Sequence, residues 1–345
     1  MDDNQFFYLR NAFYEDLDPL FELAKVLDTL NLKPDKAYLK SLIETSINSF
    51  NNESDPDMEG KYLFVLSDNK GNIIGTSMIL AEHGTPQEPH VYYQVFYDQR
   101  YCQQLDKLFK HPILRLGFDY DGPTEIGGIV IDPKYRGAKR KLGQLLSYSR
   151  FLYIGTNQNK FKDEVLAELL PPLDKEGKSL LWQNLGYHFT GLDYKTADRL
   201  STEDKDFIKN LFPSDPINAS ILGEEVGAEI GKVGAKTKPV EKMLKKIGFR
   251  YTNMIDPFDG GPHFLAKTKE ISLIQNIHSL PSESLAKNDT IEQLKKNNDN
   301  LLIGGKTKEG FIIAILISEE EKRNAHKLEF FKKNLIGNHF YTSYA

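Results

Sequence analysis

The sequence predicts a mixed α/β fold in which strands and helices are interleaved, and two kinds of apolar spacing indicate it. Apolar residues recur at i, i+3 and i+4 in some segments, which is typical of a helix with one buried face. Other segments are short apolar runs between turn residues, which is typical of buried strands. The predicted strands are 6–9, 62–66, 73–80, 91–97, 125–131, 165–169, 187–192, 249–251, 301–303 and 311–317, and the predicted helices begin near 18, 35, 142, 179 and 240.

Turn and cap residues justify several of these boundaries. A carboxylate at Asp16 or Asp18 can cap the first helix, because it accepts hydrogen bonds from the N–H groups of the first turn. The run 68–72 contains Asn and Gly, which tolerate positive φ, so a hairpin is expected between its flanking strands. Gly186 follows a short helix and is expected to end it in a left-handed conformation. The stretch 100–111 has a weakly helical pattern.

The composition excludes several classes of protein and partner. Hydrophobic residues make up 40% of the 345 residues and charged residues 27%, as in an ordinary globular chain. The formal net charge of −5 provides no attraction for nucleic acid or an anionic membrane surface. No apolar run reaches the ~20 residues of a membrane span, and the acidic start lacks the pattern of a signal peptide. Cys102 is the only cysteine, so no internal disulfide can form and a cytoplasmic protein is expected.

A strand, a basic loop with glycine and a helix follow one another at 125–153, which is typical of a pyrophosphate-binding loop. N–H groups at a helix N-terminus point outward, and the helix dipole favours an anion there. The loop is neither a Walker motif nor a Rossmann fingerprint, and a solvated basic turn would have a similar composition. The residues expected to bind phosphate are Lys139, Arg140, Lys141, Leu142, Gly143 and Gln144.

This loop resembles the R/Q-x-x-G-x-G/A motif of the GNAT superfamily of acyl-CoA N-acyltransferases. Arg140 and Gly143 are in register with the motif, whereas Leu145 replaces its last small residue. A closer resemblance, over about residues 5–270, is to the arginine N-succinyltransferases. Its most specific part is the run Phe258-Asp259-Gly260-Gly261-Pro262, and further matching positions are Asp119-Tyr120, Ile131-Asp132-Pro133, Ala167-Glu168, Trp182-Gln183 and Gly248-Phe249-Arg250-Tyr251.

The resemblance implies a GNAT-type mixed sheet flanked by helices. Residues 1–195 are expected to form the acyl-CoA-binding core. Residues 196–270 are expected to form a family-specific helix–strand extension that completes the acceptor side. Residues 271–345, with two clear predicted strands, are expected to form a small β-rich C-terminal module.

The resemblance also implies the activity. The donor would be succinyl-CoA, the acceptor the α-amine of arginine or ornithine, and the reaction the opening step of arginine catabolism. Acyl-CoA is a co-substrate here, and no permanently bound cofactor is expected. Ile129 aligns with a family position that contacts succinyl-CoA, and the backbone of Ile129, Val130 and Ile131 is expected to bind the pantetheine amides and polarise the thioester carbonyl. Family analogy implies a homo-oligomer or pairing with a paralogous subunit.

The sequence departs from the family at a residue thought to act as a proton donor. The family has a histidine after an Ile-Gly-x-Val run, whereas Gly234 follows that run here and cannot transfer a proton. Three other residues are candidates for proton transfer: Glu125 at the start of the strand 125–131, Glu168 on a later strand, and His263 after the Gly-Gly-Pro turn. Capping, ion pairing or a structural role is the alternative for each. The expected mechanism is direct attack of the neutral amine on the thioester.

Other chemistries are not indicated by the sequence. Cys102 has no histidine partner at a recognisable spacing, so no thiol nucleophile is expected. The histidines show no metal-ligand spacing, so no metal site is predicted. Two alternatives to arginine succinylation stay open: an acyltransferase with a different amine acceptor, and a catalytically degenerate acyl-CoA-binding subunit.

Overall fold

The computed structural model describes residues 4–27, 32–52, 59–137, 141–174, 176–201, 206–286, 300–317 and 320–344. The chain divides into two compact units, and each takes in segments that are far apart in sequence. Unit 1 consists of residues 1–82, 124–163 and 267–345, and unit 2 of residues 83–123 and 164–266. Each unit contains residues from more than one of the continuous segments 1–195, 196–270 and 271–345 that the sequence analysis expected to be separate domains. The division into those three domains stays a prediction.

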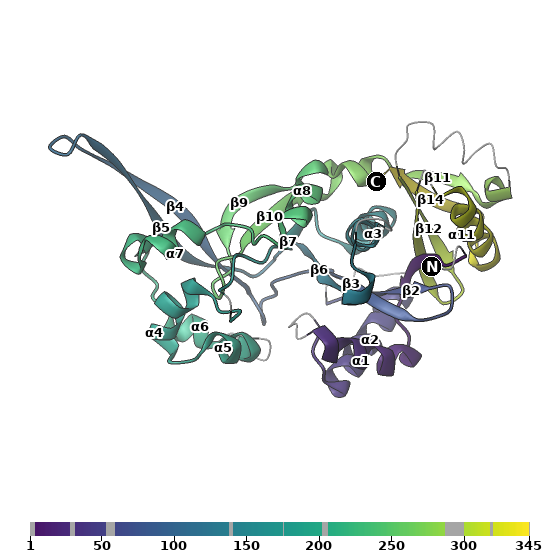
Figure 1. Ribbon diagram of the computed structural model, residues 1–345, viewed down its shortest axis with the longest axis horizontal. Coiled ribbons are helices and arrows are strands. Elements are labelled where there is room, and N and C mark those ends of the chain that lie inside the picture. The colour runs from purple at the N-terminus through teal and green to yellow at the C-terminus, as the bar shows by residue number, and fades with distance from the viewer. Residues whose placement is uncertain are drawn as a thin grey trace. The chain divides into compact units, whose positions relative to one another are not determined.

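Unit 1 is built on an antiparallel sheet that brings strands from the two ends of the chain together (Figure 1). The N-terminal strand pairs with a C-terminal strand on one side, with Leu9 opposite Ile313, and with β2 on the other side. The strands in spatial order are β11 (His278–Pro281), β14 (His339–Tyr344), β12 (Leu301–Thr307), β13 (Gly310–Leu316), β1 (Phe7–Asn11), β2 (Lys61–Asp68), β3 (Ile73–Leu80) and β6 (Thr124–Ile131).

Helices cover both faces of this sheet, and the alternation of side chains along β2 explains how. Leu63 and Val65 pack in an apolar cluster with α1 (Leu17–Leu27) and α2 (Lys36–Asn51). Phe64 points to the other face, where its ring centroid lies 5.4 Å from that of Tyr153 on α3. Figure 1 shows α3 (Leu142–Thr156) on that side, and α9 (Ser272–Gln275) and α11 (Glu321–Asn334) complete the unit. Unit 1 therefore has the layers expected of a mixed sheet flanked by helices.

Unit 2 is a smaller sheet with short helices packed around Trp182, which is 1% exposed. Its strands in order are β7 (Glu164–Glu168), β10 (Pro262–Lys267), β9 (Arg250–Ile255), β4 (His90–Cys102), β5 (Lys107–Asp119) and β8 (Ile217–Asn218). Its helices are α4 (Tyr187–Thr190), α5 (Tyr194–Ser201), α6 (Asp206–Leu211), α7 (Glu224–Glu229) and α8 (Lys238–Lys246). Among the described residues of the chain, no helix combines the length and apolar character needed to cross a membrane.

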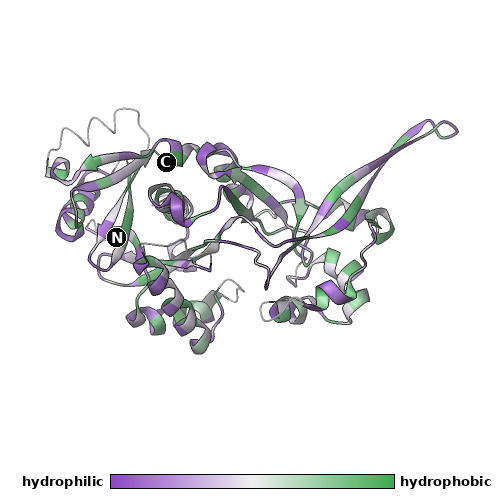
Figure 2. Cartoon of the chain, turned by 180° about the vertical axis from the view of Figure 1, so that it is seen from behind, coloured by the Kyte–Doolittle hydropathy of each residue, from purple (hydrophilic) through white to green (hydrophobic). Residues whose placement is uncertain are grey.

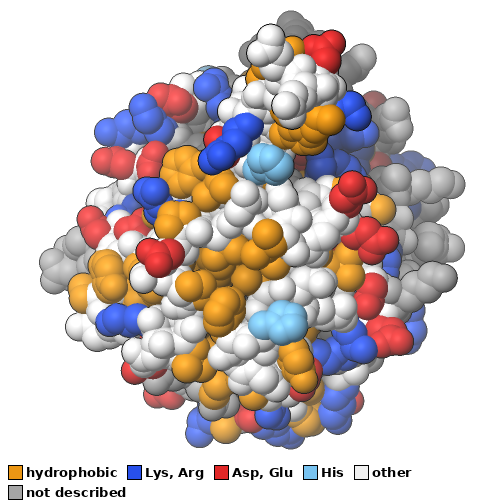
Figure 3. Space-filling model, turned by 90° about the vertical axis from the view of Figure 1, so that its left-hand side faces the viewer, with side chains coloured by type: hydrophobic (Ala, Val, Ile, Leu, Met, Phe, Trp, Pro, Cys, Tyr) orange, Lys and Arg blue, Asp and Glu red, His pale blue; other side chains and the backbone are white. Residues whose placement is uncertain are grey.

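The prediction of weak helix at 100–111 is wrong, because this stretch is the end of a long hairpin. Every residue of β4, from His90 to Cys102, pairs with a residue of β5, and this pairing outweighs local propensity. Hydrophilic and hydrophobic residues both occur along the projecting hairpin (Figure 2). Hydrophobic side chains lie among charged ones on the side of the molecule in Figure 3. The exposed large side chains of the hairpin include Phe96, Tyr97, Tyr101, Leu105 and Leu108.

The predicted strand at 187–192 is also wrong, as is the left-handed conformation of Gly186. Gly186 has a helical φ of −60°, and the chain continues into α4 before Gly191, with φ of +68°, ends the helix. The reason for glycine at 186 is close packing. A Cβ there would lie within 2.6 Å of ring atoms of Trp182.

Several other elements match the sequence prediction. The predicted strands 301–303 and 311–317 are confirmed as β12 and β13, and the predicted helix near 240 is confirmed as α8. The hairpin turn at 68–72 is confirmed, with Asp68 accepting hydrogen bonds from the N–H groups of Lys70 and Asn72. The sequence prediction missed α11 and β14, which pack with β12 and β13 as part of unit 1. It also missed the strands β5, β8, β10 and β11 and the helices α5, α6, α7 and α9.

Candidate active site

Strand β6 of unit 1 contains a bulge at the centre of the predicted acyl-CoA-binding strand. Its pairing with β3 shifts register between Thr76, opposite Val130, and Met78, opposite Gly127. Gly128 lies at the shift with φ of +60°, and a Cβ there would lie 2.8 Å from the Cβ of Met78. A bulge leaves one residue out of the regular ladder. Backbone groups at this point of β6 are therefore not all committed to strand pairing.

The bulge interrupts the alternation of side chains along β6. Glu125, Gly127 and Val130 lie opposite Leu80, Met78 and Thr76 of β3, so these three share one face of the sheet. Glu125 and Ile129 are half-buried, as are Gly127 and Ile131 between and beyond them, whereas Val130 is buried in the cluster with α1 and α2. Val130 can therefore contribute only its backbone to a ligand. Ile129, next to Val130 and beyond the register shift, is therefore on the opposite face from Glu125.

The start of α3 combines a left-handed residue with an open first turn. Lys141 adopts a left-handed conformation, with φ of 51°, immediately before the first helical residue, Leu142. Gly143 has no neighbouring atom within 4 Å of a Cβ position, so the first turn is open at this residue. Gln144 is half-buried and its Oε1 is 3.5 Å from Asn300 Nδ2. Lys139 and Arg140 lie outside the described residues.

Arg150 of α3 is a buried cation beside the β6 bulge that the sequence prediction did not single out. It is 2% exposed, and its guanidinium donates hydrogen bonds to the carbonyl oxygens of Ser147 and, at 3.3 Å, Gly127. Burial lowers its pKa to about 9, and the charge of Glu125 opposes that shift. Arg150 thus ties helix α3 to the residue that precedes Gly128, and it interacts electrostatically with Glu125.

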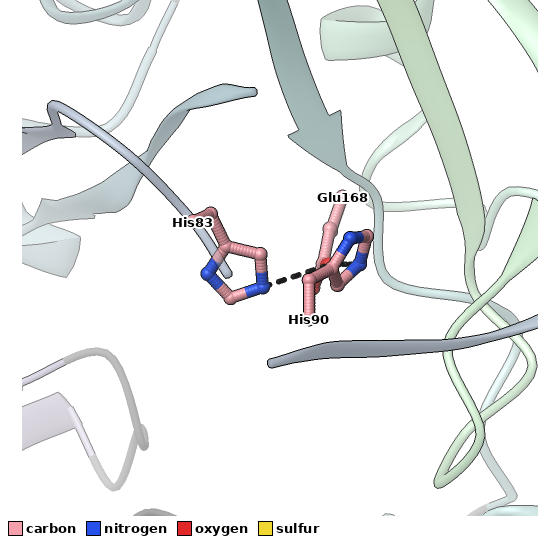
Figure 4. Close-up of side chains that lie close together, drawn as sticks. All are labelled: His83, His90 and Glu168. Atoms are coloured by element: carbon pink, nitrogen blue, oxygen red, sulfur yellow. Dashed lines mark ion pairs between the residues drawn. The ribbon is translucent and has the colours of Figure 1, made fainter. Parts of the chain in front are cut away.

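Unit 2 contains a separate cluster in which three imidazoles surround one carboxylate. Glu168 ends β7, His90 begins β4, His263 is in β10, and His83 lies in the segment before β4. The Nε2 atoms of His90, His263 and His83 lie 3.2, 3.4 and 3.8 Å from the same Oε1 of Glu168. Figure 4 shows the rings of His83 and His90 directed at Glu168. Two predicted residues, Glu168 and His263, are thus brought together, and Glu125 belongs to the other unit.

The environment of this cluster, called here the Glu168 cluster (His83, His90, Glu168, His263), keeps the carboxylate ionised. Burial alone would raise the pKa of Glu168, but the charge of His263, a hydrogen bond from His90 and the charge of His83 outweigh it and hold the pKa well below its usual range. The His90 and His263 side chains are 2% and 0% exposed, whereas His83 and Glu168 are 19% and 29% exposed. The cluster is therefore open to solvent on the His83 and Glu168 side.

Sequence reasoning missed His83 and His90. They lie on either side of a loop with Gly84, Pro86 and Pro89, and a histidine at each end of such a loop is the one available signal. The loop folds back because Gly84, with φ of +113°, packs against the start of β4, where a Cβ would lie 2.9 Å from His90 N.

Gly234, where the family histidine was expected, is closely packed by backbone. Its N–H donates to Leu170 O at 2.9 Å, and a Cβ would lie 2.5 Å from Pro171 O. His263, predicted as a substitute, belongs to the Glu168 cluster. The structure thus leaves no room for a side chain at 234 without movement of the 170–171 backbone.

The mixed sheet flanked by helices, with a bulged strand followed by a helix, is a fold of the GNAT type. The fold matches that of the arginine/ornithine succinyltransferase subunit AI from Pseudomonas aeruginosa, with a TM-score of 0.75 over 98% of both chains at 22% identity.

The sequence comparisons identify the family. The family model described as arginine N-succinyltransferase beta subunit matches residues 7–273. The arginine N-succinyltransferases of Citrobacter koseri and Shigella flexneri serotype 5b are 36% and 37% identical over 258 residues, which is 74% of this chain and of each relative. The chain belongs to the arginine N-succinyltransferase family, and the resemblance predicted from its motifs is confirmed.

Proposed function

We propose that this N-acyltransferase moves a succinyl group from succinyl-CoA to the α-amine of arginine or ornithine. The observation that carries the proposal is the family match over residues 7–273, which includes β6, α3 and the Glu168 cluster. Succinyl-CoA acts as a co-substrate, and the proposed chemistry requires no permanently bound cofactor.

The donor would be held by unit 1. The open first turn of α3, from Lys141 to Gln144, offers N–H groups to the CoA phosphates, and Lys139 and Arg140 add positive charge. The backbone of Ile129, Val130 and Ile131 would pair with the pantetheine amides. N–H groups at the Gly128 bulge would receive the thioester oxygen as it becomes an oxyanion, which is the largest stabilisation expected in acyl transfer.

Glu125 is the proposed proton acceptor. It is a half-buried carboxylate on β6, the strand that would bind the thioester, and the guanidinium of Arg150 interacts with it electrostatically. The substrate ammonium gives one proton to Glu125 and the neutral amine attacks the thioester carbon. The C–N bond forms, the C–S bond breaks, and the second amine proton leaves with CoA as its thiol. No covalent enzyme intermediate is involved.

The setting of the reaction is proposed on the same basis. The net charge of −5 and the single cysteine support a cytoplasmic protein. A homo-oligomer, or pairing with a paralogous subunit, is supported by the Pseudomonas aeruginosa relative, which is described as one subunit of an enzyme.

The test is thiol release from succinyl-CoA with a panel of arginine, ornithine, lysine and other amines. Thermal shift with CoA is measured in parallel, because a ligand stabilises the fold that binds it. We expect release that depends on arginine or ornithine. Thiol release with another amine alone would change the proposed acceptor, but it would still support acyltransferase activity. CoA binding without turnover on any amine would contradict the proposal and favour a degenerate acyl-CoA-binding subunit.

A further inference from the structure

We infer that His83, His90 and Glu168 of unit 2 bind one divalent transition-metal ion of the zinc type. The ligand atoms of these three residues lie within 4.8 Å of one another. The inference is independent of the proposed acyl transfer, whose proton acceptor and oxyanion donors belong to unit 1. Metal binding is a role for the Glu168 cluster that the family resemblance does not imply.

The ligand set is the first argument. Two imidazole nitrogens and one carboxylate oxygen are a known zinc-binding combination, and three protein ligands leave a fourth position for water or another small ligand. The solvent exposure of the three side chains agrees with three protein ligands and one open position. His90 is 2% exposed and lies at the inner side, whereas His83 and Glu168 are 19% and 29% exposed and border the open position.

The distances are the second argument. Zinc–ligand bonds of about 2.0–2.1 Å in a tetrahedral site place neighbouring ligand atoms about 3.3 Å apart. Glu168 Oε1 lies 3.2 Å from His90 Nε2 and 3.8 Å from His83 Nε2, so a shift of about 0.5 Å at His83 would bring the two pairs to tetrahedral spacing. All the ligand atoms of the three residues lie within 4.8 Å of one another. The rings of His83 and His90 have centroids 4.5 Å apart and planes at 58°, so both nitrogens can point to one place without stacking.

Each ligand is held by backbone structure, so the site is largely formed in advance. The N–H of His83 donates to Pro123 O at 2.7 Å. His90 is paired with Asp119 at the start of the β4–β5 ladder. Glu168 ends β7, and the next N–H, from Leu169, donates to Pro262 O at 3.1 Å. A preformed site avoids most of the ordering cost of binding an ion.

His263 and Asp256 provide outer support. His263 is fully buried, and its Nε2 lies 3.4 Å from the same Glu168 oxygen. Ligand atoms of Asp256, His263 and Glu168 also lie within 4.8 Å of one another. Groups of this kind orient ligating carboxylates, and their loss typically lowers metal affinity about 10–100-fold. The alternative is a purely protonic cluster, in which an imidazolium takes the place of the metal.

The absence of a predicted metal site in the sequence analysis depended on spacing along the chain. His83, His90 and Glu168 come from three segments, and their ligand atoms meet only in the folded unit. The geometry therefore points to a site that no spacing rule would have found.

The decisive experiment measures metal binding by the untagged, full-length chain after dialysis against a chelator. Zn²⁺ is titrated by calorimetry, and Co²⁺ is added separately to record visible absorption, which reports a low-coordinate nitrogen–oxygen site. We expect one equivalent of Zn²⁺ and a Co²⁺ spectrum that excess Zn²⁺ removes. The measurement needs no substrate, so its result is separate from the outcome of the acyl-transfer assay.

Matched variants locate the ion. We expect His83→Ala and His90→Ala each to lower zinc affinity more than ~100-fold, and His263→Gln to lower it ~10–100-fold. His188→Ala, an exposed histidine of the same unit, should bind zinc as the wild type does. His83→Ala keeps the test valid if the buried His90→Ala variant does not fold. Absence of stoichiometric binding by the wild type, or unchanged binding by His83→Ala, would overturn the inference.

Discussion

Strand β6 in unit 1 and the Glu168 cluster in unit 2 present polar groups in different ways. At β6, one continuous segment supplies backbone groups around a single bulge at Gly128. At the cluster, side chains from four separate segments converge on one carboxylate oxygen. The first arrangement depends on backbone conformation and tolerates many side chains. The second depends on the identity of every side chain, so it can be lost or gained while the fold is kept.

The largest expected loss of activity is for a variant of Glu125, which tests whether a residue of β6 accepts the proton. Glu125→Gln removes the proposed proton acceptor with little change in shape, so we expect kcat for succinyl transfer to fall by about 10²–10⁴-fold. KM for succinyl-CoA should stay nearly constant, because the strand backbone is unchanged. Steady-state kinetics with arginine or ornithine checks this.

The control for that prediction is Glu44→Gln on the exposed side of α2, which should leave kcat unchanged. If Glu125→Gln retained full activity while Glu168→Gln lost it, we would assign proton transfer to the Glu168 cluster. That result would contradict the assignment of this step to β6.

A smaller effect is expected when the bulge itself is altered. Gly128→Ala adds a Cβ at positive φ that would lie 2.8 Å from the Met78 Cβ, so the strand must shift. We expect the free energy of unfolding to fall by about 1–3 kcal/mol and kcat to fall by up to about 10²-fold through misplaced N–H donors. Denaturant titration and kinetics measure the two effects. Gly227→Ala, at an open position with ordinary φ on α7, is the matched control, and it should leave kcat unchanged without lowering the free energy of unfolding. Unchanged kcat in Gly128→Ala would argue against the bulge as the oxyanion site.

The same contrast explains how much of the site could be predicted from the sequence. Strand 125–131, the basic loop and helix α3 are contiguous, so their order alone indicated a phosphate-binding unit. The bulge was detectable in principle from the pair Gly127–Gly128. Glu168 and His263 were predicted one at a time, but their 3.4 Å contact, and the presence of His83 and His90 beside them, depend on tertiary pairing. No local pattern encodes such a meeting.

The fold shows the same limit. The buried strands β2 and β3 follow from short apolar runs between turn residues. The capped helix α2 follows from local apolar spacing and from Asp35, which accepts hydrogen bonds from Ala37 N and Tyr38 N. The outer part of the β4–β5 hairpin does not, because its residues are in strands through pairing with one another. Gly186 misled for a related reason. Its role is contact with Trp182, which a turn rule cannot detect.

The smallest expected change in kcat is for a variant that restores the family histidine. Gly234→His places a side chain where a Cβ would lie 2.5 Å from Pro171 O, and backbone there cannot give way as a flexible side chain can. We expect a loss of about 1–3 kcal/mol in the free energy of unfolding, as for other overpacked sites, and no gain in kcat. Gly227→His, at an open position of the same unit, should change stability by no more than about 0.5 kcal/mol. A rise in kcat in the Gly234→His variant would mean that the 170–171 backbone moves readily and that proton transfer takes place in unit 2, which would contradict the assignment of that step to Glu125.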